Sequence, residues 1–170
     1  FFGNRNDDAM IRSVFVLSLL YVVVLGMLML MGNQMVSPFL YWVMMVTPAL
    51  VVAYGVAART FNGRHSVLWK IQRTSGSFLL VMVPAYFLFI PLHPSPEIQA
   101  NFLVTGIQGL FLMAVYILLL LCALFHAGYG VWSVMNDYLS SGNLGKGLAA
   151  LVTFITLIFA WIGLRAILGI

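Results

Sequence analysis

A histidine and several small or polar residues share one face of the segment HAGYGVWSVMNDY, which runs from His126 to Tyr138. A neutral imidazole can bind iron through one ring nitrogen while the other nitrogen donates a hydrogen bond. Gly130, one helical turn after His126, would leave room for a flat macrocycle. The alternative is that His126 forms a hydrogen bond to a neighbouring helix and that Gly130 only permits close packing. At spacings of four, four, three and four residues, the face comprises Cys122, His126, Gly130, Ser133 and Asp137.

An acid and a phenol end the same helix. Asp137 lies eleven residues after His126, about 16 Å along a helix axis, and Tyr138 follows it. Together the two groups could donate and relay protons to a reducible carbonyl at the membrane edge. Alternatively, Tyr138 belongs to the interfacial aromatic belt and Asp137 is solvated.

A second polar segment, WKIQRTSG, begins at Trp69 and ends at Gly76. The five donors of Arg73 could hold a propionate or a quinone oxygen, or Arg73 could extend towards lipid headgroups. Ser75 and Gly76 would let another group approach the helix closely. Because this helix and the one carrying His126 are expected to be antiparallel, we expect Arg73 and the Asp137–Tyr138 pair to face a single cavity.

The low share of charged residues indicates a membrane protein, so helices within a lipid bilayer must position these residues. Of the 170 residues, 63% are apolar and 7% are charged, whereas soluble domains carry about 25% charged residues. Most classes of soluble enzyme are thereby excluded. The net charge of +4 reflects basic residues beside apolar runs, which indicates membrane topology and not nucleic-acid binding. A single cysteine, Cys122, excludes an intrachain disulfide and a thiolate cluster.

The sequence predicts an all-α bundle of five transmembrane helices without a soluble domain. A span needs about 20 mainly apolar residues, and turn residues or prolines, such as Ser37-Pro38 and the group Pro91, Pro94 and Pro96, separate the apolar runs. The fourth run is much longer than a bilayer requires. The expected spans are about Ile11 to Met31, Phe39 to Ala58, Lys70 to Ile90, Ile98 to Asn136 and Leu144 to Leu168.

The basic residues predict the orientation of the bundle. With five spans, only Arg165 falls on one side, and the remaining basic residues fall on the other. Because cytoplasmic loops carry the excess of Lys and Arg, we expect the N-terminus inside. The residues on the inner side are Arg5, Arg12, Arg59, Arg64, Lys70, Arg73 and Lys146.

The ordered pair of motifs, QRTSG at the start of one span and HAGYGVWSVMNDY at the end of the next, resembles the membrane-anchor (cytochrome b) subunits of succinate dehydrogenase and fumarate reductase, respiratory complex II. The resemblance covers about Trp69 to Leu168. It implies a three-helix, anchor-like bundle over residues 69–170, preceded by a two-helix N-terminal extension over residues 1–68. Kinks or Met-rich faces in the extension suggest no chemistry of their own.

The resemblance also implies residue roles. His126 matches the axial ligand of a b-type heme, and Arg73 matches the arginine near the quinone and the heme propionates. Ser75 matches a small residue at the quinone, and Tyr138, with Asp137 beside it, matches the tyrosine that hydrogen-bonds the quinone. The chain departs from some members at Trp69, where they carry a serine, and at Gln72, where a histidine can stand.

A bis-histidine heme needs two axial ligands, and the histidines of this chain are His65, His93 and His126. His93 falls on the outer side and His65 in the inner loop, so neither is expected to reach an iron at the depth of His126. The second ligand would come from another membrane subunit. The resemblance also allows an anchor that binds no heme.

The function implied is that of a subunit of succinate:quinone oxidoreductase in the tricarboxylic acid cycle and respiratory chain. It would hold the flavoprotein and iron–sulfur subunits at a bacterial or mitochondrial inner membrane and would bind ubiquinone or menaquinone, but no dicarboxylate. The alternatives are a small transporter or channel subunit, or a purely structural subunit of another complex. Transport would need polar groups at mid-depth on several helices, and four candidates there could simply bond their own backbone: Ser18, Thr47, Thr153 and Thr156.

Overall fold

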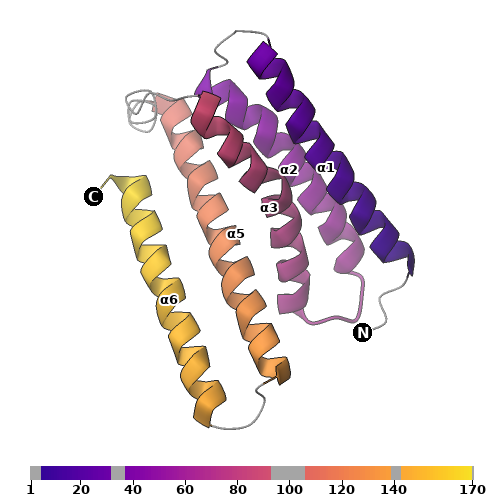
Figure 1. The fold of residues 1–170 in the computed structure, drawn as a ribbon, viewed down its shortest axis with the longest axis vertical. Helices are drawn as coiled ribbons and strands as arrows, with labels where there is room; N and C mark the ends of the chain where they lie inside the picture. Colours follow the sequence, from indigo (N-terminus) through magenta and orange to yellow (C-terminus); the bar gives the residue numbers. More distant parts are fainter. Residues whose placement is uncertain (1–4, 32–36, 93–105, 139–142, 170) are drawn as a thin grey trace.

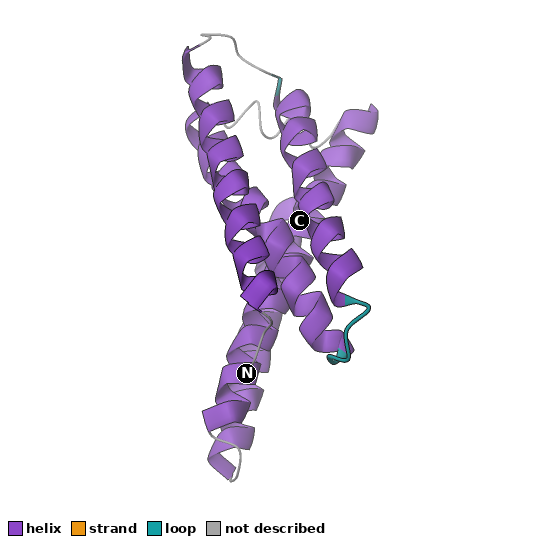
Figure 2. Cartoon of the chain, turned by 90° about the vertical axis from the view of Figure 1, so that its right-hand side faces the viewer, coloured by secondary structure: helices purple, strands orange, loops and turns teal. Residues whose placement is uncertain are grey.

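The chain folds into a bundle of long helices. The computed structural model describes residues 5–31, 37–92, 106–138 and 143–169, and within these ranges every regular element is an α-helix (Figure 2). The predicted breaks at Gly32 to Gln34 and at Pro94 and Pro96, as well as His93 and Glu97, lie outside the described residues. The helices are α1 (Arg5–Met31), α2 (Pro38–Thr60), α3 (Val67–Leu92), α5 (Gly106–Tyr138) and α6 (Asn143–Leu168).

These helices fit the five expected from the sequence. In the described part of the chain, four helical segments are long and apolar enough to cross a membrane, and α1 carries a shorter apolar stretch, Val16–Met27. The prediction of an all-α membrane bundle is therefore confirmed. The four segments are Pro38–Thr60, Val67–Ile90, Gly106–Tyr138 and Gly145–Leu168.

Local capping explains where α2 and α3 begin. The Ser37 hydroxyl accepts a hydrogen bond from the main-chain N–H of Leu40 at 3.3 Å, and Pro38 occupies the first turn. Proline is favoured in the first turn because the main-chain N–H that it lacks would have no partner within the helix. In the same way, the Ser66 hydroxyl accepts from the N–H of Trp69 at 3.3 Å. The pair Ser37-Pro38, predicted as a break, is the start of a helix.

Helix α3 lies at the centre of the bundle. It packs against α1, α2 and α5, and α6 lies at one edge against α5 (Figure 1). The core occupies the first half of α2, the second half of α3 and the first half of α5, with Val22 contributed by α1. Since lipid is as apolar as these side chains, close packing and hydrogen bonds stabilise such a core more than burial from water does. Its fully buried large side chains are Val22, Tyr41, Trp42, Met45, Val81 and Met82.

A buried hydrogen bond ties α2 to α3 inside this core. The Tyr41 hydroxyl donates to the main-chain carbonyl of Ala85 at 2.6 Å. The ring of Tyr41 lies edge-on to Trp42, with ring centroids 5.6 Å apart, and 5.3 Å from the ring of Phe89. An aromatic cluster thus joins the first turns of α2 to the last turns of α3.

The threonines that a transport pathway could have used are bonded within their own helices. Thr47 donates to Val43, and Thr153 and Thr156 donate to the carbonyls of Ala149 and Val152, at 2.7 to 2.9 Å. This is the self-bonding that the sequence allowed. Each of these hydroxyl hydrogens is therefore used within its own helix.

Replacing Tyr41 by Phe is expected to lower the free energy of unfolding by about 1 kcal/mol, because one buried hydrogen bond is lost while the ring packing is kept. Thermal unfolding in detergent measures the change. Tyr54→Phe, on the same helix but 76% exposed, is the control and should leave stability unchanged. Equal stability of both variants would contradict the role given to this bond.

Candidate functional site

A reciprocal pair of hydrogen bonds joins α3 and α5 at His126. The Nδ1 atom of His126 lies 3.2 Å from the main-chain carbonyl oxygen of Gln72. Because that oxygen only accepts, Nδ1 must carry the proton and donate. In return, the Gln72 amide Nε2 donates to the main-chain carbonyl of His126 at 3.0 Å. Each side chain thus bonds the backbone of the other helix.

Two glycines make this approach possible. A Cβ atom at Gly76 would lie 2.6 Å from Cε1 and 3.0 Å from Nδ1 of His126, and a Cβ at Gly130 would lie 3.2 Å from Nε2 of Gln72. Gly76 is four residues after Gln72, and Gly130 is four residues after His126, so each glycine lies one turn beyond the carbonyl that accepts. Gly130 therefore makes room for an amide of α3, which is the packing alternative for that residue.

Ser75 belongs to the same cluster. Its side chain is buried, and its hydroxyl donates to the carbonyl of Gln72 at 3.1 Å. That carbonyl therefore receives both the Ser75 hydroxyl and the His126 imidazole. The bond directs the hydroxyl of Ser75 along its own helix, so the quinone contact predicted for this residue stays a prediction.

Arg73 lies against an aromatic and basic group at the start of α3. Its guanidinium carbon is 4.7 Å from the centre of the Trp69 ring, within cation–π range. The ring of His65 stacks on Trp69, with centroids 4.0 Å apart and planes 25° apart. Lys70 donates to the carbonyl of Phe61 at 2.9 Å. Side chains of this end are mostly exposed, with Trp69 and Lys70 half-buried.

Asp137 and Tyr138 lie beyond the level of Arg73, whereas a single shared cavity would place all three residues at one level. Since Gly130 is level with Gln72, the remaining eight residues of α5 carry Tyr138 about 12 Å beyond that level. Figures 1 and 2 show the α5–α6 hairpin extending past the loop between α2 and α3. Tyr138 is 84% exposed. Within the described residues, no hydrogen bond or ion pair joins Arg73 to either residue.

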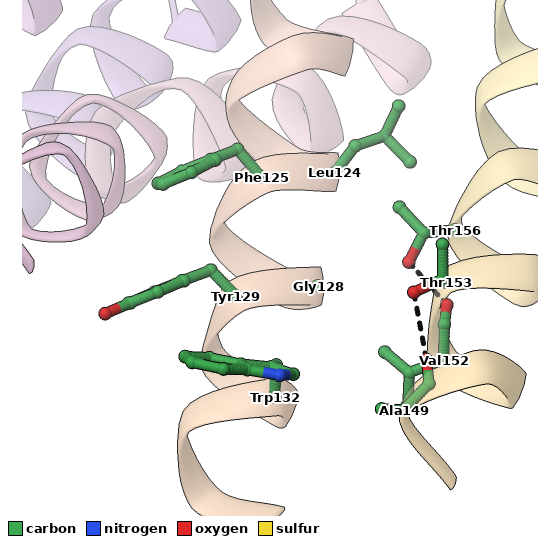
Figure 3. Close-up of a pocket in the computed structure, with 9 residues that line it drawn as sticks. All are labelled: Leu124, Phe125, Gly128, Tyr129, Trp132, Ala149, Val152, Thr153 and Thr156. Carbon is green, nitrogen blue, oxygen red and sulfur yellow. Dashed lines mark hydrogen bonds between the residues drawn. The ribbon is translucent and has the colours of Figure 1, made fainter. Parts of the chain in front are cut away.

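A groove of about 290 Å³ lies elsewhere, between α5 and α6 (Figure 3). The rings of Phe125 and Tyr129 stack in parallel with centroids 5.6 Å apart, and Trp132 continues the row at 5.6 Å from Tyr129. Figure 3 shows Gly128 facing α6 while the two stacked rings point away from it. The groove is lined by Leu124, Phe125, Gly128, Tyr129, Trp132, Ala149, Val152, Thr153 and Thr156.

Gln72 and the aromatic row are features that the sequence analysis did not identify as functional. Gln72 appeared only as a departure from a histidine, although its four-residue spacing from Gly76 repeats that of His126 and Gly130. The aromatic row also has a signal, since Phe125, Tyr129 and Trp132 are separated by four and three residues. Both patterns are visible on a helical wheel.

The chain offers no separate metal centre in its described part. Among those residues, no group of three or more His, Cys, Asp or Glu side chains is close enough to hold an ion. His126 stands apart from His65, which lies two residues before the start of α3. A metal bound here would need to bring further ligands with it, as a macrocycle does.

Gly76→Ala is expected to lower stability by about 1 to 3 kcal/mol, because the added methyl group must displace the His126 ring. Gly130→Ala should cost less, since the amide of Gln72 has to move by only a few tenths of an ångström. Gly55→Ala is the control: nothing lies within 4 Å of its Cβ position. Thermal unfolding in detergent ranks the three, and a Gly76 variant as stable as the Gly55 variant would contradict the close contact.

Comparison with known proteins assigns the chain to a family. The sequence model of the succinate dehydrogenase/fumarate reductase transmembrane subunit matches residues 58–164. This match covers more than half of the chain and includes all of α3 and α5 and most of α6. Searches of curated proteins and of solved structures found no significant match. The chain, an integral membrane protein of the respiratory chain, thus belongs to the family of membrane-anchor subunits of succinate dehydrogenase and fumarate reductase, as the motifs around Arg73 and His126 predicted.

Proposed function

We propose that this chain anchors the flavoprotein and iron–sulfur subunits of a succinate:quinone oxidoreductase, and forms part of its quinone site and of a b-type heme site. The observation that carries the proposal is the family match over residues 58–164. Within that segment, His126 Nδ1 donates to the carbonyl of Gln72 at 3.2 Å. A half-buried imidazole in the middle of an apolar helix, with one nitrogen committed to a carbonyl, keeps the other nitrogen free to bind a metal.

The residues present fit one side of a heme site. His126 would provide the axial ligand through Nε2, and a second membrane subunit would provide the other. His65 is unsuited to that role, because α3 alone separates it from the level of Gly76 by nine residues, or about 14 Å. When bound, a heme supplies a one-electron redox centre inside the bilayer. The contribution of this chain is to hold the imidazole in place and to exclude water from it.

The quinone would bind nearer the inner surface, where Arg73 lies on Trp69. Reduction of a quinone consumes two electrons and two protons, so its oxygens need hydrogen-bond donors and a supply of protons. The guanidinium of Arg73 can donate to one carbonyl oxygen, and the Tyr138 phenol can donate to the other, with Asp137 exchanging protons with water. Ser75 would line the same site. Because Tyr138 is exposed at the end of α5, we propose that a partner subunit covers this end and completes the pocket.

The distribution of charge supports an N-terminus on the inner side. The ends of α2 and α5 and the starts of α3 and α6 lie at one end of the bundle (Figure 1). Exposed Arg59, Arg64 and Lys146 belong to this end, whereas Arg165 is close to the C-terminal end of α6. We propose that the basic end faces the cytoplasm, or the mitochondrial matrix, and receives the iron–sulfur subunit. Helices α1 and α2 would then act as an N-terminal extension that braces the anchor-like part.

The heme assignment predicts a b-type absorption band in the dithionite-minus-oxidised spectrum of the purified complex. His126→Ala should abolish the band, because the axial ligand is removed, and His65→Ala should keep it. A missing band in the unmodified complex, or one that survives in His126→Ala, would remove the heme from the proposal. Subunit content is measured alongside to show that the complexes remain assembled.

The quinone assignment predicts that Arg73→Ala and Tyr138→Phe each lower succinate-dependent quinone reduction by about tenfold, the effect of losing about 1.4 kcal/mol of hydrogen bonding in the transition state. Succinate oxidation coupled to a soluble dye should stay unchanged, since that reaction bypasses the membrane subunit. Arg165→Ala, at the opposite end of the bundle, and Tyr54→Phe are the matched controls. Equal loss of both activities would indicate failed assembly and not a quinone site.

A further inference from the structure

Gln72 and His126 hold each other in place. The carbonyl of Gln72 accepts from Nδ1 of His126 at 3.2 Å, and Nε2 of Gln72 donates to the carbonyl of His126 at 3.0 Å. Both bonds require the same register of α3 against α5, because a shift by one residue moves the backbone by about 1.5 Å and lengthens both. A change that weakens either bond therefore also lengthens the other.

The orientation of the Gln72 amide follows from the same contact. The carbonyl of His126 only accepts, so Nε2 must face it and Oε1 must face elsewhere. Oε1 is buried, and it has no hydrogen-bond partner in the part of the chain that the structure describes. The amide is thus attached to the described chain through a single donor. Removing that donor tests the pair without breaking another side-chain bond.

We propose that Gln72 is the positioning residue of His126: it keeps the imidazole in the form protonated at Nδ1 and leaves Nε2 as the ligating atom. The claim that Nε2 binds an iron rests on the function proposed above. The claim that Nδ1 carries the proton does not, because Gln72 and His126 belong to the same polypeptide and pair in the chain without a heme. The ligand that this pair prepares His126 to bind is a metal centre that accepts a neutral imidazole through Nε2.

The test uses the full chain in detergent micelles with ¹⁵N-labelled histidine. The chain has three histidines, and the signals of His126 are those that disappear in His126→Ala. The ¹⁵N shifts should show the unmodified ring protonated at Nδ1. Gln72→Leu keeps the bulk and the accepting main-chain carbonyl, but it removes the donor that holds α3 and α5 in register. The bond from Nδ1 should weaken as a result and lower the ratio of the Nδ1-protonated to the Nε2-protonated form by about fivefold, the effect of about 1 kcal/mol.

Two further variants make the result specific. Gln108→Leu, an exposed glutamine near the start of α5, is the matched control and should leave the ratio unchanged. Gly130→Ala retains the amide but displaces it, since the added Cβ lies 3.2 Å from Nε2, and it should shift the ratio in the same direction by less. This variant carries the test if Gln72→Leu does not fold. An unmodified ring protonated at Nε2, or a ratio unchanged in these two variants, would overturn the proposal.

A second measurement separates this inference from the heme assignment. In the assembled complex, Gln72→Leu should shift the low-spin electron paramagnetic resonance signal of the heme while heme content stays full, because the ring orientation changes and the ligand does not. An unshifted signal would overturn the positioning role towards the iron. A complex without heme would refute the proposed function and leave the ¹⁵N result to decide the role of Gln72.

Discussion

Helices α3 and α5 exchange side-chain-to-backbone hydrogen bonds at a point where an added Cβ on either helix would crowd the bonded side chain of the other. They meet this constraint with Gly76 and Gly130, each one turn beyond an accepting carbonyl. Inside a bilayer such bonds are valuable, because water is absent and apolar contact distinguishes poorly between protein and lipid. The pairing of Gln72 with His126 therefore fixes how deep each part of the bundle lies relative to the other.

The depth fixed in this way has consequences at both ends of α3. Towards the C-terminal end of α3, the same register brings α5 alongside the aromatic core around Tyr41 and Trp42. Towards the N-terminal end of α3, α5 continues beyond the start of α3 (Figure 1), so that Tyr138, the last residue of α5, is carried past the level of Arg73. The bundle is thus closely packed in one half and open in the other. The open half is the one that holds the basic residues and the residues proposed to meet the quinone.

The class of protein and the five helices could be predicted from the sequence, because apolar length and ordered motifs depend on local composition. The heme role of His126 stays a prediction. The relative depth of Arg73 and Tyr138 could not be predicted. It depends on which residues of two helices lie opposite each other, and an antiparallel arrangement alone leaves that register free. Gln72 was overlooked because its partner is a backbone carbonyl, and the sequence marks it only by a four-residue spacing from Gly76 that repeats the spacing of His126 and Gly130. The starts of α2 and α3, in contrast, follow from the capping residues Ser37 and Ser66.

Helix α6 differs from the other helices in what it needs from its neighbours. Among the described helices it packs mainly on α5, none of its spanning segment is buried, and the hydroxyls of Thr153 and Thr156 bond its own backbone. A helix with these properties is stable in lipid before it meets any partner. During biosynthesis α6 can therefore leave the translocon and remain as a separate span until α5 is seated. Of the described helices, α6 is thus the one whose docking can wait.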